Sequence, residues 1–482
     1  MKKLIFAILL LALVCTSVST FAQQSEGSKI ISEFKYKDIK WSVPQVGKEV
    51  KREVLDNGII LYMMEDHSLP LLSMSAKIRC GEAYESTEMM AVPDFTGSIM
   101  RSGGTTNVTA DSLNAILELV GGSVETWIGS ENGGARLSVL TKDTELGVRL
   151  MADVLRNPAF PEDKIDLMKS QYKNRIKRRN DRPASILSRE FYHVIYGDHP
   201  DGRILEWAYI KDISRDDLVA YHEKYFAPNN LMIGITGDFK PKEIKKLLNQ
   251  YFGDWKQKGI TFPKIQKVKN EPKPGVYQLQ KDINQANIRF GHLGITRDNP
   301  DRFAISIMNY ILGGGSFTSR MTTKVRSDEG LAYSVRSSFN TGSRDLGTFN
   351  ASTQTKSSTA YKALRLMMDE VERIRKAPVE DEELDGAKDS YINRYVFGFT
   401  SAGQIVGRLM GLEFNDRPRD LLQKYLDNIH AVTKEDVLRV AKKYLTPENL
   451  TIMVVGNADN FDKPFDEFGA ITHIEITDPV LE

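Results

Sequence analysis

Seven histidines are the residues of this sequence best suited to hold a metal or move a proton. No two of them are four residues apart, the spacing that puts two imidazoles on one helix face and on one zinc ion. The closest pair, His193 and His199, is six apart, and Tyr196 to Pro200 has the composition of a loop. We interpret the histidines as surface or loop residues and expect no zinc hydrolysis by this chain alone. They are His67, His193, His199, His222, His292, His430 and His473.

The hydroxyl and thiol groups do not form a nucleophilic site either. Asp94 and Ser98 are four residues apart, and Thr96 adds a hydroxyl, but no histidine accompanies them to activate a serine. Cys80 stands beside Gly81 at the end of an expected strand, also without a nearby histidine. We therefore interpret Asp94, Thr96 and Ser98 as ordinary polar helix residues and Cys80 as a packed thiol.

Two further motifs suggest binding of anions but have simpler explanations. The stretch Gly313 to Ser316 lacks the Gly-Lys-Ser/Thr that would hold a nucleotide phosphate, and its glycines suit a close approach of two backbones. The basic run Lys173 to Arg179 has no interleaved aromatics, so we interpret it as a solvated helix face. Binding of acidic peptides or of a partner is the alternative for that run.

Composition excludes several classes of protein. The 482 residues carry 65 Lys and Arg against 64 Asp and Glu, and 41% are hydrophobic. This is the composition of a globular chain, and the near-zero charge argues against a nucleic-acid binder. Two cysteines, Cys15 and Cys80, are too few for a disulfide framework.

The amino terminus has the pattern of an export signal. Lys2 and Lys3 precede an apolar run from Leu4 to Val14, and small residues follow up to Ala22. We expect residues 1–22 to be a signal peptide cleaved after Ala22, and the protein to be exported to the periplasm of a Gram-negative bacterium. The run is too short for a comfortable membrane span, and no later apolar stretch approaches that length.

An internal repeat organises the rest of the chain. The segment from Ile213 to Gly237 recurs 219 positions later from Val432 to Gly456, and KSQYKNR from Lys169 lies over KDSYINR at the same offset. Because this period is far longer than a solenoid repeat, it indicates two copies of one domain. We expect an N-terminal lobe at 48–254, a proline-containing linker at 255–275, and a C-terminal lobe at 276–470.

Strand-like and helical segments alternate irregularly within each copy, which favours an α+β fold. Asn57-Gly58 between apolar runs predicts a hairpin over residues 54–61. Further strands are expected over residues 72–78, 135–140 and 286–290, and helices over residues 111–120, 303–312 and 361–374.

Taken together, these features resemble the insulinase or pitrilysin family of zinc metallopeptidases, the inverzincins, over residues 48–456. The matching motifs are Arg79 to Glu85, Gly103-Gly104-Thr105, Leu155 to Pro161, Leu312 to Arg320 and Val325 to Val335. The resemblance implies two homologous α+β lobes, each a mixed, mainly antiparallel sheet covered by helices, that form a clam-shell.

The sequence departs from this family where active members bind zinc. Those members carry H-x-x-E-H on a helix and a further glutamate roughly seventy-five to eighty residues later. Here the two histidine positions hold Asp94 and Ser98, the position of the catalytic base holds Gly97, and the later glutamate position falls near Arg175. A cation there would repel Zn²⁺. The resemblance therefore implies that this chain binds no cofactor.

The C-terminal copy retains a different feature of the family. Arg326 and Tyr333, seven positions apart, match a pair that holds the substrate backbone and the developing oxyanion in active relatives. The resemblance implies a non-catalytic subunit, inactive on its own, that binds a peptide or unfolded substrate. Its partner would be a catalytic subunit carrying H-x-x-E-H and zinc. Without the resemblance, the two residues would be a solvated helix arginine and a half-buried strand tyrosine.

Two alternatives stay open. The chain could be a stand-alone peptide-binding or scaffold protein of the cell envelope, without proteolysis. It could also be a zinc peptidase with unrecognised ligands, although carboxylates alone select zinc poorly.

Overall fold

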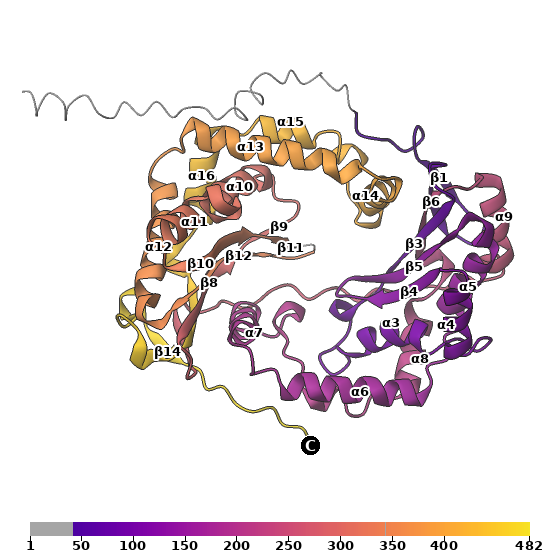
Figure 1. Ribbon diagram of the computed structural model, residues 1–482, viewed down its shortest axis with the longest axis horizontal. Coiled ribbons are helices and arrows are strands. Elements are labelled where there is room, and N and C mark those ends of the chain that lie inside the picture. The colour runs from indigo at the N-terminus through magenta and orange to yellow at the C-terminus, as the bar shows by residue number, and fades with distance from the viewer. Residues whose placement is uncertain (1–41, 343) are drawn as a thin grey trace, which may run out of the picture. The chain divides into compact units, whose positions relative to one another are not determined.

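The computed structural model describes residues 42–342 and 344–482, and residues 44–482 form one compact unit (Figure 1). The expected signal peptide lies outside the described residues, so it stays a prediction. In the described part of the chain, no helix is both long and apolar enough to cross a bilayer.

A six-stranded sheet forms the centre of the first lobe. Its order is β1-β2-β6-β3-β5-β4, and all neighbours are antiparallel except the parallel pair β2 and β6. Helices cover one face of this sheet (Figure 1) and enclose the first hydrophobic core with it. The strands are β1 (Lys51–Val54), β2 (Ile60–Glu65), β3 (Leu71–Arg79), β4 (Ser123–Ile128), β5 (Asn132–Leu140) and β6 (Leu231–Gly237). The helices are α3 (Val92–Ser102), α4 (Ala110–Leu119), α5 (Thr144–Arg156), α6 (Glu162–Lys177), α8 (Arg215–Tyr225) and α9 (Pro241–Phe252).

The second lobe has a sheet of the same size. Its order is β10-β12-β8-β13-β7-β14, with β7 parallel to both β13 and β14. The strands are β7 (Gly275–Gln280), β8 (Gln285–Leu293), β10 (Ala332–Phe339), β12 (Thr348–Lys356), β13 (Thr451–Gly456) and β14 (Ile471–His473), and β9 (Ile295–Thr296) and β11 (Thr341–Gly342) form a separate short pair. The helices are α10 (Arg302–Asn309), α11 (Arg320–Thr322), α12 (Ala360–Lys376), α13 (Asp381–Val396), α15 (Tyr425–His430) and α16 (Lys434–Tyr444).

The predicted repeat is visible element by element. Helices α8 and α16 begin and end 219 residues apart, and each starts with a capping box, built on Ser214 and on Thr433. Helices α6 and α13 show the same offset, and β6 and β13 occupy equivalent places in the two sheets. The expected α+β class with two homologous lobes on mainly antiparallel sheets is therefore confirmed.

The lobes exchange one helix each. Helix α7 (Pro183–Tyr196) follows the first sheet's helices in sequence, but its apolar side packs on Met453, Val455 and Leu279 of the second sheet. Its repeat partner, α14 (Ala402–Phe414), packs on β6 and β2 of the first sheet. The approach is close, because a Cβ atom at Gly234 would lie 2.7 Å from Val406. Each lobe is thus completed by a helix from the other half of the chain.

The local predictions agree well with the structure. The hairpin of β1 and β2 turns at Asn57-Gly58, where Gly58 has a φ of 91°, a left-handed conformation that favours glycine. Residues 255–274, within the expected linker, contain no helix or strand. The sheet of the second lobe extends past the expected end at residue 470, because β14 pairs with β7. The lobe boundaries themselves stay a prediction.

Candidate functional site

Helix α3 is the element that would carry zinc ligands in the first lobe. Pro93 lies in its first turn, and Phe95, Ile99 and Met100 anchor it in the core. Asp94 and Ser98 follow one another along the helix: Ser98 is exposed, and Asp94 is half-buried. Both are polar helix residues, as expected from the sequence.

Helix α6 places an aromatic ring and a cation beside Asp94. The hydroxyl of the buried Tyr172 donates a hydrogen bond to the Asp94 carboxylate. The guanidinium of Arg175 lies over the same ring, 4.3 Å from its centroid. Burial, and then the bond to Asp94, raises the pKa of the Tyr172 hydroxyl, so it stays a donor near neutral pH. Asp94 is therefore already engaged by neighbours of its own chain.

Gly97 brings helix α3 into contact with the edge strand β4. A Cβ atom at this position would lie 2.4 Å from the backbone nitrogen of Ile128, and Thr126 donates a 2.6 Å hydrogen bond to the Gly97 carbonyl. The space that a glutamate side chain would need at position 97 is therefore filled by strand backbone.

These residues do not fit a zinc ion. A catalytic zinc site needs three protein ligands, whereas this place offers one engaged carboxylate, one serine hydroxyl and a nearby guanidinium. Throughout residues 42–342 and 344–482, no cluster of three His, Cys, Asp or Glu could hold a metal. The residues beside Asp94 therefore do not form a catalytic zinc site.

Two histidines, His222 and His292, lie neither in a loop nor at the surface, and a third, His199, lies in the expected loop but is buried. His199 is 5% exposed, and its ring nitrogens lie 3.6 Å from Asp201 and 3.7 Å from Asp345. His222 is buried in α8, where its Nε2 lies 2.9 Å from the carbonyl oxygen of Leu155. Burial lowers the pKa of His222 to about 4. His292 is 7% exposed on β8. The interpretation was therefore wrong for His222 and His292, whose contacts come from segments distant in sequence.

The interpretation of Cys80 as a packed thiol is confirmed. Its side chain is fully buried, and burial raises the pKa of the thiol to about 12. A thiol with that pKa carries almost no thiolate at neutral pH, so it is a poor nucleophile.

In the second lobe, Arg326 and Tyr333 lie together at the surface. Arg326 is in a π-helical segment, Thr323–Asp328, and its guanidinium lies 4.8 Å from the ring centroid of Tyr333 and 4.5 Å from that of Phe317. Tyr333 is 85% exposed and Phe317 is 63% exposed, so the tyrosine is not half-buried. Cation–π contacts on two sides orient the guanidinium and leave its edge free to donate hydrogen bonds.

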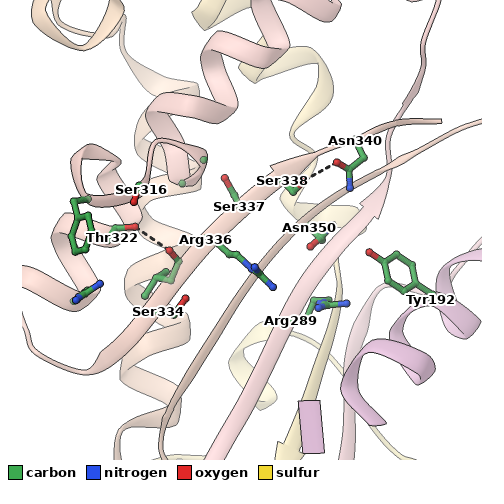
Figure 2. Close-up of a pocket in the computed structure, with 15 residues that line it drawn as sticks. Tyr192, Arg289, Ser316, Thr322, Ser334, Arg336, Ser337, Ser338, Asn340 and Asn350 are labelled. Atoms are coloured by element: carbon green, nitrogen blue, oxygen red, sulfur yellow. Dashed lines mark hydrogen bonds between the residues drawn. The ribbon is translucent and has the colours of Figure 1, made fainter. Parts of the chain in front are cut away.

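A pocket of about 550 Å³ adjoins this cluster, and we call it the arginine pocket. It is lined by Arg289 of β8, Arg326 and Arg336 of β10, by serine and asparagine side chains, and by Tyr192 of α7. Figure 2 shows Arg336 reaching along the sheet face toward Arg289, which extends toward Tyr192. No Asp or Glu of the described residues lines it.

Sequence reasoning did not find Arg289, Arg336 or Tyr192. The arginines are 47 residues apart on strands that flank β12, and Tyr192 is contributed by the exchanged helix. No short motif connects them.

The prediction that the glycine run lets two backbones approach closely is confirmed at Gly313. A Cβ atom there would lie 2.7 Å from the backbone nitrogen of Ser337 on β10.

Comparisons with known families agree with this architecture. The family described as insulinase (peptidase family M16) matches residues 64–207, and the peptidase M16 inactive domain matches residues 212–391. This two-lobe chain, with altered residues at the zinc position, belongs to the insulinase family and resembles its inactive type.

Curated relatives are described as uncharacterized zinc proteases. One from Streptomyces coelicolor is 24% identical over 353 residues, which span 71% of this chain and 76% of that protein. Another, from Mycobacterium tuberculosis, is 24% identical over 407 residues, which span 84% and 92%.

Solved structures share the fold. A peptidase M16 inactive domain from Pseudomonas fluorescens has a TM-score of 0.77 at 25% identity and covers 86% of this chain and all of that one. The periplasmic protease PqqL from Escherichia coli has a TM-score of 0.74 at 16% identity over 88% of this chain and 47% of its own.

Proposed function

We propose that this chain is the non-catalytic subunit of an exported insulinase-family zinc metallopeptidase of a Gram-negative periplasm. In this proposal it binds a peptide or unfolded segment and completes the active site of a partner subunit that carries H-x-x-E-H. The zinc belongs to the partner, where it would polarise the scissile carbonyl and activate water.

One observation carries the proposal. The first lobe has Asp94, Gly97 and Ser98 where relatives have zinc ligands and a base, whereas the second lobe presents Arg326 and Tyr333 side by side at the surface. An arginine and a tyrosine with free donor groups are suited to a substrate carbonyl and to the negative charge that develops on it. Without a metal of its own the chain cannot use these two residues in hydrolysis, so they are consistent with an active site shared with a zinc-carrying partner.

Reconstituted cleavage tests the proposal. A catalytic relative from the same organism, with H-x-x-E-H intact, is mixed with this chain, and cleavage of a fluorogenic peptide is followed. Arg326→Gln and Tyr333→Phe should each lower the turnover number by about a hundredfold, the usual effect of removing one oxyanion donor. Both side chains lie at the surface, so folding should be retained, as circular dichroism would verify.

Arg394→Gln is the matched control, because Arg394 is an exposed arginine of the same lobe on α13. It should leave cleavage unchanged. Undiminished cleavage by the Arg326 and Tyr333 variants, with the complex assembled, would refute the proposal.

A stand-alone peptide-binding or scaffold protein is the second candidate. The engaged Asp94 and the closed contact of Gly97 with β4 favour it, since both are compatible with a lobe that no longer serves catalysis. This alternative predicts a stable homodimer, peptide binding, and no gain of cleavage with any partner.

A further inference from the structure

The arginine pocket contains positive charge without a compensating acid. Arg336 on β10 pairs with Ser352 on β12, and Ser352 pairs with Arg289 on β8, so the three side chains lie in one row on the same sheet face. The two arginine-bearing strands are thus about 10 Å apart, with a small residue between them. This arrangement leaves a hollow between two guanidinium groups.

None of the three pocket arginines has an ion-pair partner among the described residues. Within the described residues, the only hydrogen bond that their guanidinium groups donate is from Arg289 Nη1 to the Ser188 hydroxyl, at 3.1 Å, and Arg289 Nε is buried without a partner. Burial and the charge of Arg336 lower the pKa of Arg289. Uncompensated charge of one sign is costly, and an anionic ligand would relieve that cost.

The remaining lining groups also suit an anion. Ser316 and Ser334 contribute hydroxyl groups, and Asn340 and Asn350 contribute amide groups, whereas the Ser338 hydroxyl already donates to Asn340 Oδ1. The rings of Phe191 and Tyr192 each lie 5.6 Å from the Arg289 guanidinium and hold it in place. The positive charge is a feature of this pocket and not of the whole protein, because the full chain has a net charge of only +1.

Helix α7, which contributes Tyr192 to the arginine pocket, also lines a second basic pocket. Arg175, Arg178, Arg179, Arg182 and Arg189 line a hollow of about 500 Å³ with a single acid, Asp181. Ser185 and Arg189 line this pocket and Tyr192 lines the first, and these residues succeed one another along one side of α7. Arg189 pairs with Glu190, Arg179 with Glu206 and Arg178 with Asp181, so the charge of this second pocket is largely compensated, unlike that of the arginine pocket.

We propose that the arginine pocket binds a carboxylate of the peptide substrate and gives this subunit a preference for acidic segments. The inference rests on the proposed function, because the pocket shares Arg326 with the proposed substrate-contact pair. A peptide in contact with Arg326 and Tyr333 would place its neighbouring residues against Arg336 and Arg289. The guanidinium groups of Arg336 and Arg289, separated by the small Ser352, are suited to hydrogen-bond a planar carboxylate between them.

Binding to the purified chain, without any partner, tests this inference. Fluorescence anisotropy would compare unstructured peptides identical in sequence except that glutamate is replaced by glutamine or by lysine. The glutamate peptide should bind at least about tenfold more tightly than the glutamine peptide, and Arg336→Gln should remove most of that difference. Arg336→Glu should shift the preference toward the lysine peptide, and Arg394→Gln should change nothing.

Amidated and free carboxyl termini separate the two sources of carboxylate. A glutamate preference that persists on amidation assigns the pocket to acidic side chains and supports the inference. A loss of affinity on amidation without any glutamate preference assigns the pocket to the terminal carboxylate and overturns the preference for acidic segments. Equal binding of the glutamate and glutamine peptides would overturn it. Binding of inorganic phosphate but not of glutamate peptides would also overturn it, in favour of another anion.

The two proposals fail in distinguishable ways. In the reconstituted assay, Arg336→Gln should raise KM for glutamate-containing peptides only, whereas Tyr333→Phe should lower turnover of all peptides. If no partner gains activity but the glutamate preference persists, only the shared active site is refuted.

Discussion

Equivalent rows of side chains cross the two sheets, and their charges differ. In the first lobe the row runs from Glu125 on β4 to Arg136 on β5, Ser75 on β3 and Gly234 on β6, so an acid lies directly opposite a base. The matching row of the second lobe is Arg336, Ser352, Arg289 and Met453, and Gly234 and Met453 are 219 residues apart.

The difference shows how one duplicated fold divides two roles. Opposite charges facing each other across strands stabilise the first sheet. In the second sheet the row holds two arginines, Arg336 and Arg289, separated by Ser352 and without an acid. This arrangement contributes less to stability and is better suited to binding an anion. This difference fits our proposals, in which the first lobe supports the fold and the second lobe presents the groups that face a ligand.

Restoring the zinc motif should break the first lobe rather than activate it. The triple change Asp94→His, Gly97→Glu and Ser98→His inserts a side chain where β4 backbone already lies. We expect a loss of about 3 kcal/mol or more in the free energy of unfolding, measured by urea titration, because overpacking of this kind is costly. A variant that keeps its stability and binds one zinc would contradict the closed contact at Gly97.

Acid should weaken the first lobe through His222, whose repeat equivalent in the second lobe is Ala441. The pKa of His222 is about 4 in the folded protein against an ordinary 6.5. Between pH 6.5 and 4 the unfolded chain therefore takes up a proton at this histidine that the folded chain does not. Stability should therefore fall as pH drops from 6.5 to 4, by roughly 3 kcal/mol in total, and this contribution should be constant below pH 4.

Urea titrations at several pH values would measure this effect. His222→Gln should reduce the pH dependence, whereas His193→Gln, at an exposed position, should not. An unchanged profile for His222→Gln would show that another group is responsible.

The second lobe has its own close helix contact at Gly313. Gly313→Ala would place a methyl group 2.7 Å from the backbone nitrogen of Ser337 on β10. We expect a loss of about 2 kcal/mol in the free energy of unfolding. A neutral effect would mean that β10 can move away, and the arginine pocket would then lack a rigid wall.

The smallest expected effect has the opposite sign. Gly407 lies within the exchanged helix α14, and a Cβ atom there would meet no atom within 4 Å. Gly407→Ala should therefore stabilise the protein by about 0.5 to 1 kcal/mol, since glycine costs that much in a helix. Destabilisation would indicate that α14 packs more tightly on the first sheet than described.

Sequence patterns predicted what is local. The Asn57-Gly58 hairpin, the helix over residues 111–120 and the repeat follow from turn chemistry, periodicity and self-similarity, and all three are found, the helix as α4. Which strands neighbour each other and which helix crosses to the other sheet depend on contacts between distant segments. For this reason the row of Arg336 and Arg289, the place of Tyr192 and the burial of His199 could not be predicted.

The most direct test measures zinc content and peptide cleavage for the chain alone and after mixing with an H-x-x-E-H partner. Our account predicts no stoichiometric zinc and no cleavage by the chain alone, and zinc-dependent cleavage by the mixture that Tyr333→Phe reduces about a hundredfold. One zinc per chain together with chelator-sensitive cleavage in the absence of any partner would contradict it.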